Sequence, residues 1–263
     1  MKSINSRDNA SYKAMHRLVS RSSERKSSAR SVLDGAHLLQ AFLESGRTPE
    51  EVMVNRAGAE DAAIAALVRR SAPAPVTQLG DALFRSLSTV DSPTGVIASV
   101  MTPQARPVPR DASLVLLLED IQDPGNVGAL LRSAAAAGVA HVMLSARCAF
   151  AWSPKVLRAA MGGHFALNIV EGADLDAFVA GYAGSAIALA GAGERSLYDC
   201  DLRGPIALIV GNEAAGISAG LAARAQARAR IPTSGRVESL NAAIAGSVAL
   251  FECVRQRASP GRK

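Results

Sequence analysis

Polar and charged side chains lie just beyond apolar runs at three places in the C-terminal half of the sequence. The segments are Asp123-Pro-Gly-Asn-Val-Gly-Ala-Leu-Leu-Arg132, Ile209-Val-Gly-Asn-Glu-Ala-Ala-Gly216 and Ile231-Pro-Thr-Ser-Gly-Arg-Val-Glu-Ser-Leu-Asn241. In an α/β sheet, residues beyond the strand ends present backbone groups and side chains to a ligand. Because all three segments lie at predicted strand exits, we expect them to converge on one crevice.

The first segment has two interpretations. Asn126 is a favoured N-cap for a helix predicted over 127–137. Alternatively, Asn126 and Arg132 face a phosphate or a developing oxyanion, because the amide groups at a helix N-terminus favour anions. The segment by itself leaves both interpretations open.

The other two segments add a carboxylate, a hydroxyl and an amide. Glu213 follows a predicted strand over 206–210, and its alternative role is a surface ion pair worth only ~0 to 1 kcal/mol. Ser239 is the predicted N-cap of a long final helix over about 238–257, and Asn241 follows in the first turn. An apolar stripe of Leu240, Ile244, Val248 and Phe251 on that helix is expected to be core or a subunit interface.

Alternating strands and helices surround these segments. Strands are predicted over 114–118, 141–144, 166–170, 186–190 and 206–210, with helices over 127–137 and 154–161 between them. The alternation predicts an α/β domain with a mostly parallel sheet covered by helices on both faces.

The N-terminal half predicts a smaller mixed α/β unit. Its helices are expected over 32–43, 59–70 and 80–87, and its strands over 51–54, near Val76 and over 95–100. Three prolines between Thr102 and Arg110 disfavour helix and central strand and predict an extended linker. We therefore expect a basic arm over 1–14, a first domain over 15–101, the linker over 102–110 and a second domain over 111–263.

The charge is concentrated at the N-terminus. Eight Lys and Arg face two acidic residues in the first 30 positions, a difference that equals the net charge of +6. Arg25, Lys26 and Arg30 in this Ser-rich stretch are candidate contacts to nucleic acid, because basic side chains neutralise phosphates. The alternative is a solvated tail that aids solubility.

Several other classes of protein are disfavoured. No apolar run approaches the ~20 residues of a membrane span and no export leader is evident, so we expect a cytoplasmic protein. The cysteines Cys148, Cys200 and Cys253 are too widely spaced for a disulfide framework or a zinc site and are expected to be small buried hydrophobes.

Two short motifs typical of other enzyme classes lack the accompanying residues that those enzymes require. Gly216-Ile-Ser-Ala-Gly220 matches a hydrolase nucleophile pattern, yet all four histidines precede Ser218 and no aspartate follows it. Gly191-Ala-Gly193 lacks the third glycine of a dinucleotide loop. His164 is expected to be a packing residue rather than a base.

Taken together, the three segments resemble motifs 1, 2 and 3 of the SpoU (TrmH) family of RNA ribose 2'-O-methyltransferases, in the SPOUT superfamily. Residues 15–100 resemble, more loosely, the L30e-like substrate-binding domain that often precedes this catalytic domain. The resemblance implies a trefoil knot in the C-terminal domain, a homodimer, and S-adenosylmethionine held by backbone groups around Gly211, Ile231 and Leu240. Two positions depart from the family pattern. Many members have methionine where this chain has Thr233, and others have valine-serine where it has Ala242-Ala243.

The resemblance also assigns roles to side chains. Asn126, Arg132, Glu213, Ser239 and Asn241 match the functional residues of the family. A guanidinium rarely gives up its proton, so we interpret Arg132 as a phosphate clamp and oxyanion stabiliser rather than the base. No metal is required.

The expected function is S-adenosylmethionine-dependent methylation of a ribose 2'-OH in RNA. Ribosomal RNA, with a guanosine of the large subunit as the favoured target, is preferred over transfer RNA, because a separate domain can hold structured RNA away from the methylated ribose. A transfer RNA methyltransferase and a non-catalytic RNA-binding protein on the same fold are the alternatives.

Overall fold

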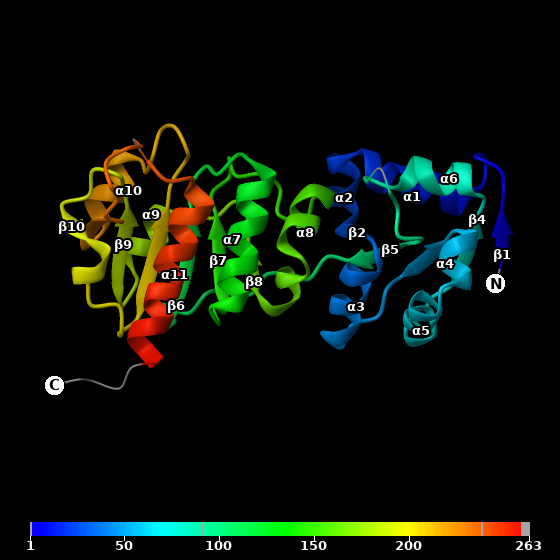
Figure 1. The fold of residues 1–263 in the computed structure, drawn as a ribbon, viewed down its shortest axis with the longest axis horizontal. Coiled ribbons are helices and arrows are strands. Elements are labelled where there is room, and N and C mark those ends of the chain that lie inside the picture. Colours follow the sequence, from blue (N-terminus) through cyan, green and yellow to red (C-terminus); the bar gives the residue numbers. More distant parts are fainter. Residues whose placement is uncertain (1, 91, 238, 259–263) are drawn as a thin grey trace. The chain divides into compact units, whose positions relative to one another are not determined.

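The computed structural model describes residues 2–90, 92–237 and 239–258 (Figure 1). The chain divides into two compact units. Unit 1 contains the chain up to Gln104 together with Trp152–Phe165, and unit 2 contains Ala105–Ala151 and the chain from Ala166 onward. The division after Gln104 falls inside the Pro-rich segment, whereas the assignment of Trp152–Phe165 to unit 1 differs from the predicted second domain.

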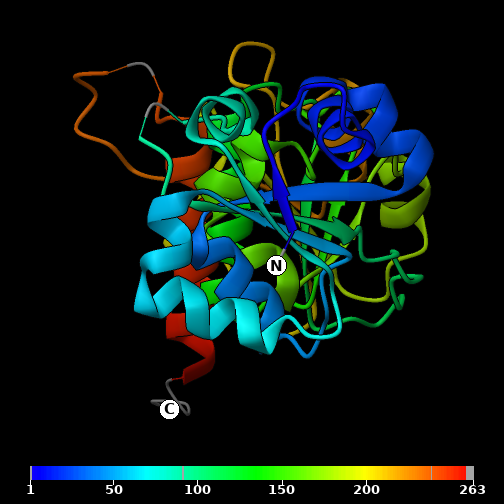
Figure 2. The same cartoon turned by 90° about the vertical axis from the view of Figure 1, so that its right-hand side faces the viewer.

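Within the described residues, unit 1 is built on a mixed sheet in the order β1-β4-β3-β5-β2. Its strands are β1 (Lys2–Ile4), β2 (Arg30–Asp34), β3 (Glu51–Val54), β4 (Val76–Leu79) and β5 (Val96–Met101). Its helices are α1 (Ala10–Ser20), α2 (Ser22–Ser28), α3 (Ala36–Glu44), α4 (Arg56–Glu60), α5 (Ala62–Arg70), α6 (Asp81–Leu87) and α8 (Pro154–Ala160). Figure 2 shows helices on both faces of this sheet.

One sequence-based expectation for unit 1 is wrong. The segment expected as one helix over 32–43 is strand β2 followed by helix α3, because β2 pairs with β5 and Gly35, at a φ of 114°, separates the two elements. The segment expected as an arm over 1–14 is folded. β1 pairs with β4, and α1 buries Tyr12 and Met15 in the core of the unit.

Unit 2 has a sheet whose described strand pairings are all parallel, in the order β10-β12-β9-β11-β6-β7-β8. Its strands are β6 (Leu114–Leu118), β7 (His141–Leu144), β8 (Asn168–Val170), β9 (Ser185–Leu189), β10 (Arg195–Ser196), β11 (Ile206–Val210) and β12 (Ala227–Arg230). Its helices are α7 (Pro124–Ala136), α9 (Leu175–Ala180), α10 (Ala219–Arg224) and α11 (Ala242–Ala258). The predicted α/β class with a mostly parallel sheet is confirmed.

Helices cover both faces of this sheet, as a sheet of fully buried strands requires. α7 packs with α11 on one face and α9 packs with α10 on the other (Figure 1). The α7–α11 contact is close at Gly246, where an added Cβ would lie 2.4 Å from Cδ2 of Leu130. On the opposite face, Leu175 and Phe178 of α9 join the core formed by the inner strands.

The strand order reverses beside β6. The chain runs from β6 to β7 and β8 on one side, crosses to β9, and then places β11 between β9 and β6. In the parallel register Val210 of β11 pairs with Leu118 of β6, so the loops that follow these two strands leave the sheet side by side. Such a switch point is where open α/β sheets bind ligands.

Candidate functional site

Three polar side chains from the three segments form a chain of hydrogen bonds at this switch point. Asn126 on α7 donates from Nδ2 to Oε1 of Glu213 at 2.6 Å. Asn241 donates from Nδ2 to Oδ1 of Asn126 at 3.0 Å. These residues are separated by 87 and 115 positions in sequence, respectively. We call Asn126, Glu213 and Asn241 the polar triad.

The capping pattern explains why these side chains are available. Asp123 is the N-cap of α7 and accepts from the amide of Asn126 at 2.8 Å, with Pro124 in the first turn. The interpretation of Asn126 as a helix cap is therefore wrong. Its side chain instead bonds to Glu213 and Asn241.

The cap of α11 also differs from the prediction. Oδ1 of Asn241 accepts from the amides of Ala243 at 2.9 Å and Ile244 at 3.2 Å, so Asn241, not Ser239, caps this helix. The helix begins at Ala242 rather than near position 238, and Glu238 lies outside the described residues. Asn241 thus links the N-terminus of α11 to the polar triad.

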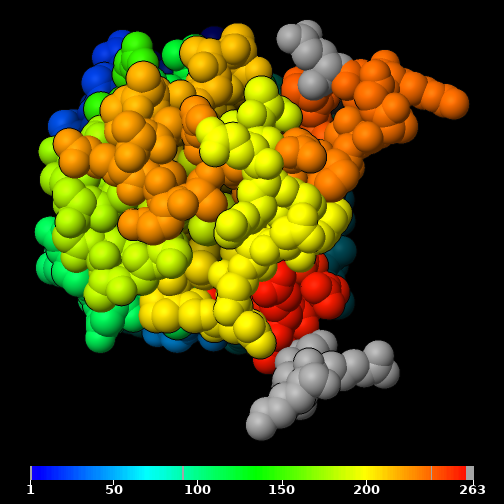
Figure 3. All heavy atoms as spheres, turned by 90° about the vertical axis from the view of Figure 1, so that its left-hand side faces the viewer, coloured from blue at the N-terminus to red at the C-terminus, as the bar shows by residue number. Residues whose placement is uncertain are grey.

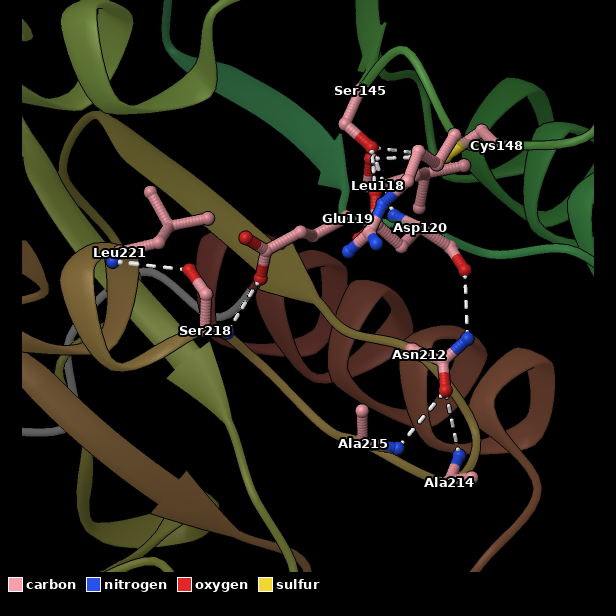
Figure 4. Close-up of polar contacts among 11 residues, drawn as sticks. Leu118, Glu119, Asp120, Ser145, Cys148, Asn212, Ala214, Ala215, Ser218 and Leu221 are labelled. Carbon is pink, nitrogen blue, oxygen red and sulfur yellow. Dashed lines mark hydrogen bonds and ion pairs between the residues drawn. The ribbon is translucent and has the colours of Figure 1, made fainter.

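The loop that carries Glu213 is shaped by the residue before it. Asn212 donates from Nδ2 to the carbonyl of Asp120 at 2.8 Å and accepts from the amides of Ala214 and Ala215, each at 2.9 Å (Figure 4). Its backbone also exchanges two hydrogen bonds with Gly216. These contacts fix the turn after β11 and set the position from which Glu213 extends.

A second group of polar residues joins the loops after β6 and β7. Asp120 adopts a φ of 57°, and its carboxylate accepts from the hydroxyl of Ser145 at 2.6 Å and from the guanidinium of Arg147. The hydrogen bond from Arg147 lowers the pKa of Asp120 below its usual value. Glu119 accepts from the amide of Ser218 at 2.8 Å (Figure 4). We call Asp120, Ser145, Arg147 and Asn212 the loop network.

A cavity of about 640 Å³ opens beside Glu213. The three residues predicted to hold a cofactor, Gly211, Ile231 and Leu240, lie in its wall, and so does Ser239. The exposed loop after Ile231 projects from unit 2 in orange in Figure 3. Binding sites for small molecules have volumes of roughly 300 to 1,000 Å³, so the cavity can hold a cofactor.

Gly211 has a structural reason to lack a side chain. An added Cβ would lie 2.4 Å from the carbonyl carbon of Gly216, because the Asn212–Gly216 turn folds back against it. The tight turn also keeps the backbone at the strand exit open to the cavity. Sequence reasoning identified Gly211 but did not identify Asn212, which forms this turn.

The structure does not bring Arg132 to the polar triad. It lies six residues after Asn126 on α7, which is about 240° around the helix axis and about 9 Å along it. Its side chain is exposed. Arg132 is thus exposed on a different side of α7 from Asn126.

The three basic residues proposed to contact RNA differ in their burial and in their partners. Arg25 is only 6% exposed and donates to the backbone carbonyls of Leu18 and Val19, so it holds α1 and α2 together and is not a surface contact. Lys26 and Arg30 are exposed, and Arg30 forms an ion pair with Glu50 at 2.6 Å. The expectation for Arg25 is wrong, because burial of an amphipathic segment cannot be read from its charge alone.

Other expectations concern the cysteines and His164. Cys200 and Cys253 are buried as predicted, whereas Cys148 is partly buried. Burial raises the pKa of each thiol, and that of Cys253 rises to about 11. His164 is 1% exposed and packs against Trp152, which confirms a packing role.

Within residues 2–90, 92–237 and 239–258, no group of three or more His, Cys, Asp or Glu side chains is arranged to bind a metal ion. Among the same residues, no helix combines the length and apolarity needed to cross a bilayer.

The parallel sheet, its switch point and the adjoining cavity define an α/β domain that binds a small cofactor. Residues 113–251 match the SpoU rRNA Methylase family, and residues 9–98 match the MRM3-like substrate binding domain. The chain therefore belongs to the SpoU rRNA methylase family.

Individual relatives extend this result over almost the full chain. An uncharacterised tRNA/rRNA methyltransferase of Synechocystis is 33% identical and aligns over 97% of this chain and 94% of its own. The 23S rRNA guanosine 2'-O-methyltransferase RlmP of Bacillus subtilis is 28% identical over 95% of this chain and 98% of its own. The solved AdoMet-bound rRNA methyltransferase of Sinorhizobium meliloti has 27% identity and a TM-score of 0.83, with 97% of each chain covered.

Proposed function

We propose that this protein transfers a methyl group from S-adenosylmethionine to a ribose 2'-OH of ribosomal RNA, with a guanosine of the large subunit as target. The observation that carries the proposal is the polar triad, in which all three sequence motifs meet beside a cavity of about 640 Å³. Membership of the SpoU rRNA methylase family and the guanosine specificity in the name of RlmP support the same assignment.

The cavity fits the cofactor. Its wall is built from backbone and small side chains after β9, β11 and β12, and such a surface suits an adenosine and a methionine moiety. S-adenosylmethionine supplies an electrophilic methyl group when bound. Gly211, Ile231 and Leu240 would hold it, with Glu213 and Ser239 at the same wall.

The chemistry requires a ribose hydroxyl to be positioned and to lose its proton. In-line approach at about 3 to 3.5 Å can contribute ~7 to 11 kcal/mol to such a transfer. Glu213, held by Asn126, can accept a hydrogen bond from the hydroxyl, and Asn241 fixes the amide of Asn126. The proton then leaves through water or a phosphate oxygen of the RNA.

Arg132 has the role of a phosphate clamp in this proposal. Its exposed position about 9 Å along α7 from Asn126 suits a contact with the backbone of the approaching RNA. The guanidinium stays protonated in proteins and forms bidentate bonds with phosphate, so it can stabilise negative charge but is a poor base.

The surface of α11 supports a homodimer. Ile244 is 55% exposed and Phe251 is 50% exposed, and with Val248 they form one apolar stripe along the helix. The stripe is therefore not core within the described chain. Its burial against a second copy of the chain is the use we propose for it, and replacement of Phe251 by Glu should shift the protein toward monomer in light scattering coupled to size-exclusion chromatography.

Three further features belong to the proposal. We expect the trefoil knot of SPOUT domains in unit 2, a cytoplasmic location where ribosomal RNA is available, and a role for unit 1 in holding RNA. Exposed basic residues such as Lys26 and Arg30 would contribute phosphate contacts without sequence preference.

The test is transfer of labelled methyl from S-adenosylmethionine to unmodified ribosomal RNA and, separately, to transfer RNA. Label at one ribose of large-subunit RNA is the expected result. Label confined to transfer RNA would favour the alternative substrate. Absence of label in both pools and in assembling ribosomal particles, with RNA still bound, would contradict catalysis and favour a non-catalytic RNA-binding protein.

A further inference from the structure

The loop after β9 forms a wall of the cofactor cavity. Gly191 and Ala192 lie in that wall, together with the end of β9. The sequence motif Gly191-Ala-Gly193 fails as a dinucleotide loop, yet the structure places it at the cavity. We call residues 190–194 the wall loop.

The wall loop is bonded tightly to β12. The amide of Ala190 donates to the carbonyl of Ala229 at 2.9 Å, and the amide of Gly193 donates back to Ala190 at 3.0 Å, which closes a turn. At Gly193 an added Cβ would lie 2.6 Å from the carbonyl carbon of Ala229. The glycine therefore permits contact between the two backbones that no other residue allows.

An arginine completes this attachment. Arg230, the last residue of β12, donates from Nη1 to the carbonyls of Gly193 at 2.9 Å and Glu194 at 3.2 Å. The side chain of Glu194 is paired with Arg228 on the same strand. Arg230 immediately precedes Ile231, which lies in another wall of the same cavity.

Arg230 therefore connects two walls of the cavity. Its backbone leads into the loop that starts at Ile231, and its guanidinium holds the wall loop that carries Gly191 and Ala192. A loop of small residues has many accessible conformations, so its ordering requires fixed partners. One planar guanidinium that binds successive carbonyls supplies them.

We propose that Arg230 is a positioning residue for the cofactor: it holds the wall loop in the conformation that receives S-adenosylmethionine. The inference rests on the proposed function, because it assumes that the cavity is the cofactor site. It predicts that Arg230 determines affinity for the cofactor and for its product, S-adenosylhomocysteine, with little influence on RNA affinity.

The test compares Arg230→Met with Arg230→Lys and with Arg224→Met. The last is a control that removes an exposed arginine of α10, which is paired with Asp176 of α9. Titration calorimetry with S-adenosylmethionine and S-adenosylhomocysteine gives Kd without RNA or turnover. If loss of the two bonds leaves the wall loop in its receptive conformation about a tenth of the time, Kd for both ligands rises roughly tenfold in Arg230→Met.

The two other variants sharpen the result. Arg230→Lys keeps a charged donor but loses the guanidinium geometry, so its Kd should lie between wild type and Arg230→Met. Arg224→Met should bind as wild type does. RNA affinity, measured by filter binding, should be unchanged in all three variants.

Each outcome is decisive. An unchanged Kd in folded Arg230→Met overturns the inference while leaving the proposed function intact, and absence of cofactor binding by the wild type overturns both. If Arg230→Met fails to fold, Gly193→Ala provides the second measurement, because its Cβ displaces the wall loop from β12. Wild-type affinity in Gly193→Ala would then reject the inference, and a similar rise in Kd would support it.

Discussion

The polar triad and the loop network lie at the ends of neighbouring strands, yet they are built differently. In the loop network, Asn212 bonds three backbone groups, and Asp120 is held by Ser145 and Arg147. In the triad, the side chains of Asn126, Glu213 and Asn241 bond one another, and two of the three are exposed. Bonds to backbone fix the path of a loop, whereas exposed bonds between side chains can be exchanged for bonds to a substrate. The comparison therefore separates Asn212, which shapes the loop, from the triad residues, which we propose act on the substrate.

The largest expected effect is a loss of methyl transfer when Arg132 of α7 is replaced, compared with Arg147 of the loop network. Arg132→Ala should reduce methyl transfer roughly 10²- to 10³-fold, because a charged group that stabilises developing negative charge contributes about that much. Its Kd for S-adenosylmethionine should match wild type, as Arg132 is not in the cavity wall. The matched change Arg147→Ala should reduce transfer far less. Weakened cofactor binding with a normal rate of transfer in Arg132→Ala would reject its assignment as a clamp.

Asn126 and the N-cap Asp123 lie close together at the start of α7, and their substitution should affect activity and stability differently. Asn126→Ala should lower transfer about 10-fold or more, since it removes the orientation of Glu213, and should leave the free energy of unfolding within about 0.5 kcal/mol of wild type. Asp123→Ala removes the N-cap and should cost about 1 kcal/mol of stability. Chemical denaturation and initial rates measure both. Equal destabilisation by the two changes would show that Asn126 is structural.

Asn212→Ala tests the loop network through stability. The change removes three hydrogen bonds and deprives the part-buried carbonyl of Asp120 of its donor Asn212, so the free energy of unfolding should fall by about 1 to 3 kcal/mol. Transfer should fall as well, because Glu213 follows in the same turn. Urea denaturation that gave wild-type stability would contradict the role assigned to Asn212.

The smallest effect is a dependence of stability on pH. Arg147 lowers the pKa of Asp120 in the folded protein, so its stabilising contribution is present above the unfolded-state pKa and is lost as the pH falls through the folded-state pKa. Asp120→Asn should therefore lose less stability than wild type between about pH 6 and about pH 2. Asparagine also tolerates the φ of 57° at this position. Parallel stability profiles for the two proteins would exclude the contribution.

The sheet of unit 2 was predictable because its central strands are buried on both faces. β6 and β11 are continuous apolar runs, and the predicted bounds of 114–118 and 206–210 match those observed. β12 was missed, since Ala227-Arg-Ala-Arg230 alternates small and charged residues as a half-exposed strand does but lacks β-branched or aromatic residues. The prediction of one helix over 32–43 was wrong because the first part of this segment belongs to β2, whose pairing with β5 overrides the local apolar pattern.

The sequence motifs predicted which residues gather at the site but not the hydrogen bonds between them. The motifs identified Asn126, Glu213 and Asn241, whereas their mutual hydrogen bonds depend on tertiary register. Asp123 before Pro124 carries the sequence signature of a helix start and could have removed the capping interpretation of Asn126. Arg230 carries no local signal for its role, since its partners lie 36 and 37 positions away.

The role of the polar triad is tested by single-turnover methyl transfer by Glu213→Gln, measured beside its Kd for S-adenosylmethionine and its free energy of unfolding. Glutamine retains the size of the side chain and can still accept from Asn126, but it lacks the negative charge that strengthens the hydrogen bond from the ribose hydroxyl. If the polar triad acts as proposed, Glu213→Gln should transfer methyl about 10²-fold more slowly, with affinity and stability equal to wild type. Transfer at the wild-type rate would contradict the claim that the polar triad performs the reaction.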